Sequence, residues 1–160
     1  MPEWLQKKLI EPTNLRAKAD DLRALGRTIA TLNGSFDLLH AGHLHIIYEA
    51  SKQADCLIVA LNSDASIRQY KSPNRPIISL PYRLELMAAL EFVSFVTWFE
   101  ETDPRSLLSC IKPDVHVNGE EYGAQCIEAE TILAYGGRLH IVELIDSLST
   151  TNIINAIKCG

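Results

Sequence analysis

The chain has 160 residues, of which 47% are hydrophobic and 22% charged, and its formal net charge is −5. This length and composition predict one globular unit with a buried core and exclude a disordered or fibrous protein. No apolar run approaches the ~20 residues of a membrane span, the first ten residues lack the pattern of a secretory signal, and the acidic balance argues against nucleic-acid binding.

The hydrophobic pattern predicts helices and strands that alternate along the chain. In chain order, the first half is expected to hold a helix at 13–25, a strand at 28–33, a turn at 34–42, a helix at 43–53, a strand at 56–61, a helix at 64–69 and a proline-containing loop at 70–80. The second half is expected to hold a helix at 81–90, a strand at 93–98, a helix at 104–111, a strand at 114–118, a helix at 126–135, a strand at 138–144 and a helix from Thr151. This alternation is typical of an α/β fold with a mostly parallel sheet, in which ligands bind at the carboxyl ends of the strands.

The segment from Asn33 to His43 (NGSFDLLHAGH) leaves the first predicted strand and opens a helix. His40 and His43 are three residues apart, so both rings can face one ligand if they lie on the first turn of that helix. Gly42 lets a phosphate approach the backbone, and the N–H groups of a helix N-terminus add anion contacts. A lone histidine is more often structural, whereas two histidines and two glycines at a strand-to-helix turn favour a phosphate site.

Two further segments fit a phosphate ligand. From Ala65 to Leu84 the chain has no Asp or Glu, and its basic residues are Arg68, Lys71, Arg75 and Arg83. They form either a solvated loop face or a mobile arm that neutralises phosphates. The run from Ser149 to Asn152 precedes the last apolar helix, where it serves as an N-cap or, beside a phosphate site, as a second anion cradle.

These three segments, in this order, resemble the nucleotidyltransferase superfamily defined by a His-x-Gly-His motif, whose second signature is similar to Ser149–Thr151. Leu38 and Leu39 resemble the cytidylyltransferase and heptose-phosphate members, because pantetheine-phosphate and nicotinamide-mononucleotide adenylyltransferases usually have a proline at position 38. Further segments resemble the heptose 1-phosphate adenylyltransferases, namely 62–66, 71–76, 89–91, 113–115 and 149–154.

Other segments depart from this subfamily. Asn118 stands where it generally has a lysine, and the turn Asp146-Ser147-Leu148 stands where it commonly has a glycine. The acidic-aromatic run Glu120–Tyr122 is more like the glycerol-3-phosphate cytidylyltransferases. The alternatives are therefore a cytidylyltransferase that uses CTP, a non-catalytic nucleotide sensor, and a fragment of a class I aminoacyl-tRNA synthetase, although those enzymes are far longer and need tRNA-binding surfaces.

The resemblance implies a Rossmann-like, mostly parallel five-stranded sheet with helices on both faces. A nucleotidyltransferase domain at 27–160 would follow an N-terminal helical extension at 1–26. The implied reaction is transfer of a nucleoside monophosphate from ATP to heptose 1-phosphate, with release of pyrophosphate. Such a reaction requires positioning and charge stabilisation rather than a protein nucleophile. Mg²⁺ would be held mainly by triphosphate oxygens, so no protein ligand to a metal is predicted.

Site residues follow from these motifs. The predicted catalytic residues are His40, His43, Lys71 and Arg83. The predicted nucleotide-binding residues are Gly34, Ser35, Phe36, Asp37, His40, Gly42, His43, Asn118, Gly119, Ser149, Thr150 and Thr151. The predicted acceptor-binding residues are Asp37, Lys71 and Arg75. The nucleobase is expected against backbone groups of 117–122 and residues after Leu148.

Assembly and compartment are further expectations. The aromatic run at 92–99 (FVSFVTWF) fits either core packing or a contact between two copies, and the resemblance favours a homodimer. The four cysteines at positions 56, 110, 126 and 159 are too scattered for a Cys-x-x-Cys site. With no secretory signal, this pattern predicts a reduced, cytoplasmic protein.

Overall fold

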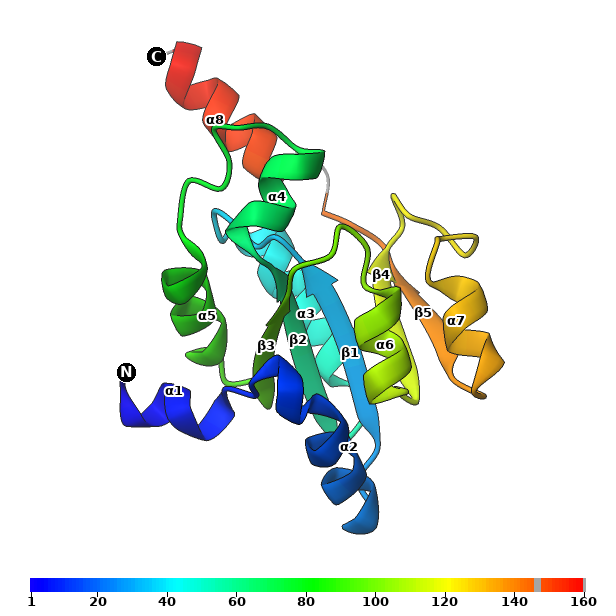
Figure 1. The fold of residues 1–160 in the computed structure, drawn as a ribbon. Helices are drawn as coiled ribbons and strands as arrows, with labels where there is room; N and C mark the ends of the chain where they lie inside the picture. Colours follow the sequence, from blue (N-terminus) through cyan, green and yellow to red (C-terminus); the bar gives the residue numbers. More distant parts are fainter. Residues whose placement is uncertain (146–147, 160) are drawn as a thin grey trace.

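A parallel sheet of five strands forms the centre of the molecule, in a computed structural model that describes residues 1–145 and 148–159 (Figure 1). The strands are β1 (Ile29–Gly34), β2 (Cys56–Asn62), β3 (Phe95–Phe99), β4 (Val115–Gly119) and β5 (Arg138–Val142). Their order is β3-β2-β1-β4-β5, and each neighbouring pair is parallel. The predicted α/β, Rossmann-like fold is confirmed, and its sheet is parallel throughout.

Helices cover both faces of this sheet. The helices of the described residues are α1 (Glu3–Lys8), α2 (Leu15–Ala24), α3 (Ala41–Ser51), α4 (Asp64–Tyr70), α5 (Leu80–Ala88), α6 (Arg105–Ile111), α7 (Ala129–Ala134) and α8 (Thr150–Cys159), with a 3₁₀ turn at Pro12–Asn14, and α8 buries none of its residues. Ile47 of α3 and Met87 of α5 pack into the core on one face, whereas Leu22 of α2, Leu108 of α6 and Ile132 of α7 pack into the core on the other. In Figure 1, α2 and α6 lie in front of the sheet and α3 lies behind it.

The N-terminal segment packs against the rest of the chain. Leu5, Ile10 and Leu15 are buried in the two cores, and the Ile10 backbone N–H donates to the Val96 carbonyl at 2.8 Å. Leu9 forms a parallel bridge with Val96 of β3, the outermost strand on that side. The boundary at residue 26 stays a prediction, and residues on both sides of it share the same cores.

The predicted elements differ from the structure mainly at their ends. The helix expected from residue 43 begins at Ala41, because His40 has an extended backbone and serves as its N-cap. A 3₁₀ turn beginning at Pro12 precedes α2, so that helix starts at Leu15 rather than at residue 13. Of the aromatic run at 92–99, Val96 and Phe99 are buried in the chain's own core, which accounts for part of its apolar character.

The strand order places a ligand crevice beside β1. The chain builds β1, β2 and β3 outward in one direction and then returns to place β4 on the other side of β1. Ligands of such sheets bind at this reversal, outside the carboxyl ends of the two strands. Gly34 and Gly119 are the last residues of β1 and β4, so the crevice lies just beyond these two glycines. None of the helices in the described residues combines the length and apolar character that a membrane crossing needs.

Candidate active site

A cavity of about 260 Å³ lies at the carboxyl ends of β1 and β4. Most of the predicted site residues line it: Gly34, Ser35, Phe36, His40, Gly42, His43, Lys71, Asn118, Gly119, Ser149, Thr150 and Thr151. The structure therefore brings together segments that are more than a hundred residues apart in the sequence. Asp37, Arg75 and Arg83 are not among the lining residues, and each contacts protein groups behind the cavity wall.

His40 and His43 form a stacked pair at the start of α3. Their ring centroids are 3.8 Å apart with an interplanar angle of 23°, and the Phe36 ring meets His43 edge-on at 5.3 Å. Gly42 allows this stack, because a Cβ at that position would lie 3.0 Å from the His40 ring. Both ring nitrogens of His40 and Nδ1 of His43 are buried without a hydrogen-bond partner in the described chain. The pair is therefore available to a ligand in the cavity.

Both imidazoles are less basic than free histidine. Burial lowers the pKa of His43 to about 4, and the neighbouring His40 and Lys71 lower this pKa further, against an opposing contact with the Leu38 backbone. Burial also lowers the pKa of His40. At pH 7 the two rings are neutral, so each offers one N–H donor and one acceptor nitrogen. An anionic ligand can therefore accept a hydrogen bond from each ring.

Lys71 supplies a cation to the same cavity. It follows the last residue of α4, and its Nζ donates to Ser35 Oγ at 2.8 Å. Partial burial lowers the pKa of Lys71, and the positive charge of Arg75 lowers it further. An incoming phosphate would reduce this electrostatic penalty, because it places a negative charge beside the ammonium group.

Asp37 anchors the basic loop to the motif that contains the histidines. Its carboxylate is fully buried and accepts hydrogen bonds from the backbone N–H groups of Ile77 and Ile78, both at 2.8 Å, and from Arg75 Nε at 2.6 Å. Burial by itself would raise the pKa of Asp37, but the two N–H groups and Arg75 outweigh it and lower the pKa. The loop expected to be either a solvated face or a mobile arm is thus bonded to Asp37, and Arg75 Nη2 is buried with no hydrogen-bond partner among the described residues.

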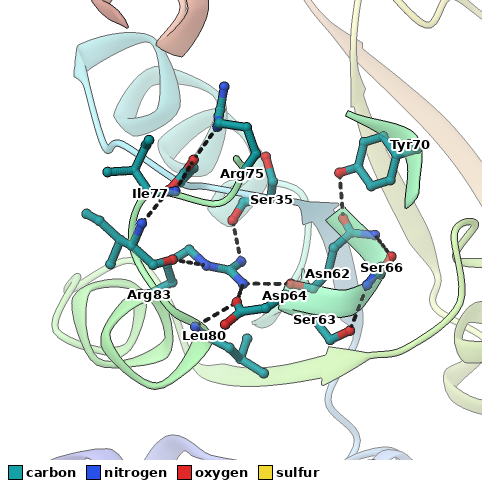
Figure 2. A network of polar contacts seen from close by, with 12 residues as sticks. Ser35, Asn62, Ser63, Asp64, Ser66, Tyr70, Arg75, Ile77, Leu80 and Arg83 are labelled. Carbon is teal, nitrogen blue, oxygen red and sulfur yellow. Dashed lines mark hydrogen bonds and ion pairs between the residues drawn. The ribbon is translucent and has the colours of Figure 1, made fainter. Parts of the chain in front are cut away.

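Arg83 lies behind the cavity in a network of protein acceptors (Figure 2). Its Nε donates to the Ile78 carbonyl at 2.9 Å and its Nη1 to the Ser35 carbonyl at 2.6 Å. Its Nη2 donates to the Asn62 carbonyl at 3.0 Å and to Asp64 Oδ1 at 2.7 Å. The side chain is fully buried, so these contacts hold the backbone of Ser35 in place. These contacts support a positioning role for Arg83 through the Ser35 backbone, and its predicted catalytic role stays a prediction.

The residues at the start of α8 form both a helix cap and part of the cavity wall. Ser149 Oγ accepts a hydrogen bond from the Asn152 backbone N–H at 3.1 Å, as an N-cap does. Thr150 Oγ1 donates to the Leu38 carbonyl at 3.4 Å, which ties this segment to the histidine motif. The two interpretations of Ser149–Thr151 are therefore compatible.

Sequence reasoning missed some of the wall. Leu144 and Ile145 line the cavity just after β5, and Asn33 lines it at the end of β1. Glu121 also lines it, and its carboxylate folds back over Gly119, where any Cβ would clash with it. Their positions in the sequence could have indicated them, because each lies at or just after the carboxyl end of a predicted strand, where ligands bind. Asp146 and Ser147, which belong to the turn where the subfamily commonly has a glycine, lie outside the described residues.

Comparisons with known proteins point to one family. The family model of cytidylyltransferase-like domains matches residues 31–156. The chain is 42% identical over 145 residues to the bifunctional protein HldE of Hahella chejuensis, which covers 90% of this chain and 30% of that protein. It is 44% identical over 157 residues to HldE of Pseudomonas syringae pv. tomato, which covers 98% and 33%. The chain thus spans about a third of the length of these curated relatives.

Solved structures show the same fold. The lipopolysaccharide core biosynthesis protein of Thermoplasma volcanium superposes with a TM-score of 0.61 at 30% identity, over 75% of this chain and 98% of that one. Pantoate-beta-alanine ligase of Francisella tularensis superposes with a TM-score of 0.61 at 16% identity, over 94% of this chain and 77% of that one. The second comparison supports the fold alone.

Proposed function

Because the chain belongs to the cytidylyltransferase-like family, we propose that it is a nucleotidyltransferase that joins the nucleoside monophosphate of ATP to D-glycero-D-manno-heptose 1-phosphate and releases pyrophosphate. The observation that carries the proposal is the convergence of three segments on one cavity: the unpartnered His40–His43 pair, Lys71, and the start of α8. The similarity to bifunctional HldE proteins and to a lipopolysaccharide core biosynthesis protein supports a sugar phosphate as the acceptor.

The proposed reaction is an in-line displacement at phosphorus. A phosphate oxygen of the acceptor attacks the α-phosphorus of ATP, a new P–O bond forms, and the bond to the pyrophosphate oxygen breaks. The acceptor phosphate is already anionic at pH 7, so catalysis consists of positioning and charge stabilisation. His40 and His43 donate to the α-phosphate, Lys71 and Ser35 hold the acceptor phosphate, and Ser149–Thr151 surround the outer phosphates.

We expect Mg²⁺ to accompany the triphosphate. This cation keeps most of its ligands as phosphate oxygens and water in such sites. The donor set fits, because the hydroxyls of Ser149–Thr151 and the carboxylate of Glu121 line the cavity. Mg²⁺ neutralises part of the charge that develops on the departing pyrophosphate.

The base is proposed to lie against the backbone of residues 117–122, with Leu144, Ile145 and Leu148 as an apolar wall. Adenine is favoured by the similarity of residues 62–66, 71–76 and 149–154 to the heptose enzymes. The run Glu120–Tyr122 favours the second candidate, a cytidylyltransferase that uses CTP and glycerol 3-phosphate. A pocket built for one base rejects the other where its polar groups are left unpaired.

A pyrophosphate-release screen tests the proposal. ATP and CTP are each combined with a panel of sugar and polyol phosphates in the presence of Mg²⁺. We expect release with ATP and heptose 1-phosphate, whereas nucleotide binding without release in any combination would indicate a sensor. Isothermal titration of both nucleotides decides the base, and binding of CTP tenfold tighter than ATP, about 1.4 kcal/mol, would favour the cytidylyltransferase.

Assembly and location are part of the proposal. We propose a homodimer in the cytoplasm, with no nucleic acid as a partner. The half-buried Trp98 and the exposed Phe92 of the aromatic run are available to a second copy. Light scattering that shows a monomer at micromolar concentration would contradict the dimer.

A further inference from the structure

Two amide side chains lie side by side at the carboxyl ends of β1 and β4. Leu32 pairs with Val117 in the parallel register, so Asn33 and Asn118 follow one residue later on adjacent strands. Side chains alternate between the faces of a sheet, which places both amides on the face of Thr31 and His116, two residues earlier. That earlier pair is in contact, with Thr31 Oγ1 2.8 Å from His116 Nδ1. Both amides line the cavity.

Each amide presents one atom without a partner. Asn33 Oδ1, an acceptor, and Asn118 Nδ2, a donor, are buried and make no hydrogen bond to each other or to another group of the described chain. The Asn118 residue is only 5% exposed. Buried polar groups are almost always paired, so an acceptor and a donor left open together are complementary to a ligand that presents both.

The charge around the amides disfavours phosphate. Glu121 lines the cavity with its carboxylate over Gly119, the residue after Asn118, and Glu128, whose carboxylate is buried, contacts the Cys126 thiol. Carboxylates repel a phosphate group and accept hydrogen bonds from hydroxyls. The histidine pair lies elsewhere, since α3 packs on the opposite face of the sheet. The amide face therefore suits a neutral, hydroxyl-bearing group.

We propose that Asn33 and Asn118 bind two neighbouring hydroxyl groups of the acceptor and thereby determine its specificity. This inference rests on the proposed function and names the residues that recognise the sugar. One hydroxyl donates to Asn33 Oδ1, and the next accepts from Asn118 Nδ2. Ser35, which contacts Lys71 at the proposed acceptor-phosphate site, is two residues from Asn33. That separation is roughly 6–7 Å along an extended chain, which a single sugar ring can span.

Binding of the acceptor tests the inference without requiring turnover. Heptose 1-phosphate and ethyl phosphate, which has no hydroxyl, are titrated by calorimetry into protein saturated with α,β-methylene-ATP. Asn118→Leu keeps the branching at Cγ but removes the donor, and Asn33→Leu removes the acceptor. We expect each variant to bind heptose 1-phosphate about tenfold more weakly or worse, and to bind ethyl phosphate as the wild type does. Asn14→Leu, the same change at an exposed position far from the cavity, is the matched control.

The outcomes separate this inference from the function on which it rests. Circular dichroism checks folding, and Asn118→Ser replaces Asn118→Leu if the latter does not fold. The inference is overturned if the variants bind heptose 1-phosphate as the wild type does, if the nucleotide is what they lose, or if the wild type does not distinguish heptose 1-phosphate from ethyl phosphate. A wild type that shows the expected selectivity but releases no pyrophosphate contradicts the proposed function and leaves the amide pair supported.

Discussion

Two groups of basic side chains surround the cavity, and the protein holds them in opposite ways. The Arg83 guanidinium is fully buried and donates four hydrogen bonds to protein oxygens. His40 lies a few residues after Ser35, whose carbonyl accepts one of these bonds. Both ring nitrogens of His40 nevertheless lack a hydrogen-bond partner in the described chain. The lesson is that positive or protonatable character near the cavity does not by itself identify a residue that contacts a ligand. A side chain whose hydrogen-bonding groups are paired within the protein, such as Arg83, supports the site, whereas a side chain with unpaired groups, such as His40, can contact a ligand.

Replacement of Arg83 is expected to have the largest effect. Arg83→Ala leaves Asp64 and two carbonyl groups without their donor, and loss of one partner of a buried ion pair destabilises by about 3–5 kcal/mol. We expect the melting temperature to fall by roughly 10 °C, measured by circular dichroism. Arg83→Lys should fall nearly as far, because an ammonium group lacks the planar fork. An Arg83 variant that melts like the wild type but is inactive would indicate that Arg83 contacts the ligand.

The histidine pair should show the reverse pattern. His40→Ala and His43→Ala each remove a donor proposed to face the α-phosphate, and loss of one such donor lowers kcat by about 10²–10³-fold. The melting temperature should stay close to that of the wild type. Steady-state pyrophosphate release gives kcat, and His45→Ala, on the same helix outside the cavity, is the control. Normal turnover in both single variants would remove the pair from the mechanism.

Replacement of Lys71 should lower activity without lowering the melting temperature, as for the histidines, but by a smaller factor. The ammonium group of Lys71 makes one hydrogen bond within the described chain, to Ser35, so Lys71→Ala should leave the melting temperature unchanged. Loss of a cation beside the acceptor phosphate is expected to lower kcat/KM by about tenfold, or about 1.4 kcal/mol. Arg68→Ala removes an exposed cation from the same helix as the control. An unchanged rate for Lys71→Ala would support the alternative of a solvated loop.

The smallest expected effect is a dependence of stability on pH. Burial lowers the pKa of both His43 and His116 to about 4, while the unfolded chain titrates near 6.5. Between these values the unfolded chain binds more protons, so stability is lost as the pH falls from 6.5 towards 4. From pH 7 to 6 the two histidines together should account for about 1 kcal/mol. Thermal melts should show this slope, and the double variant His43→Gln/His116→Gln should flatten it.

Local patterns in the sequence predicted the fold and the histidine motif. Strand and helix periodicities are short-range, and His40, Gly42 and His43 lie within one helical turn of each other. Element ends were less predictable, because the start of α3 depends on the backbone of His40 rather than on the hydrophobic pattern. The order of strands in the sheet followed from no local signal, although the alternation indicated that the strands are parallel.

Long-range pairing limited the prediction of the site. The acid-free stretch suggested free arginines, but Asp64 immediately precedes it and bonds to Arg83, while Asp37 bonds to Arg75 from far away in the sequence. Asn33 and Asn118 meet only through the register of β1 and β4, which no spacing within the sequence reveals. The motifs that lie within single segments were predictable, whereas the pairings of Arg75, Arg83 and the two amides with residues of other segments were not.

The contact between the N-terminal segment and β3 covers part of one edge of the sheet. An edge strand with unpaired backbone groups is a template for pairing with other chains. Here Leu9 and Ile10 occupy part of that edge, and Leu5 and Leu9 line an apolar groove together with Leu84 and Trp98. A chain shortened to begin after Ile10 would expose the edge and remove one wall of the groove. Such a truncated protein should assemble into β-paired aggregates even though its catalytic segments are intact.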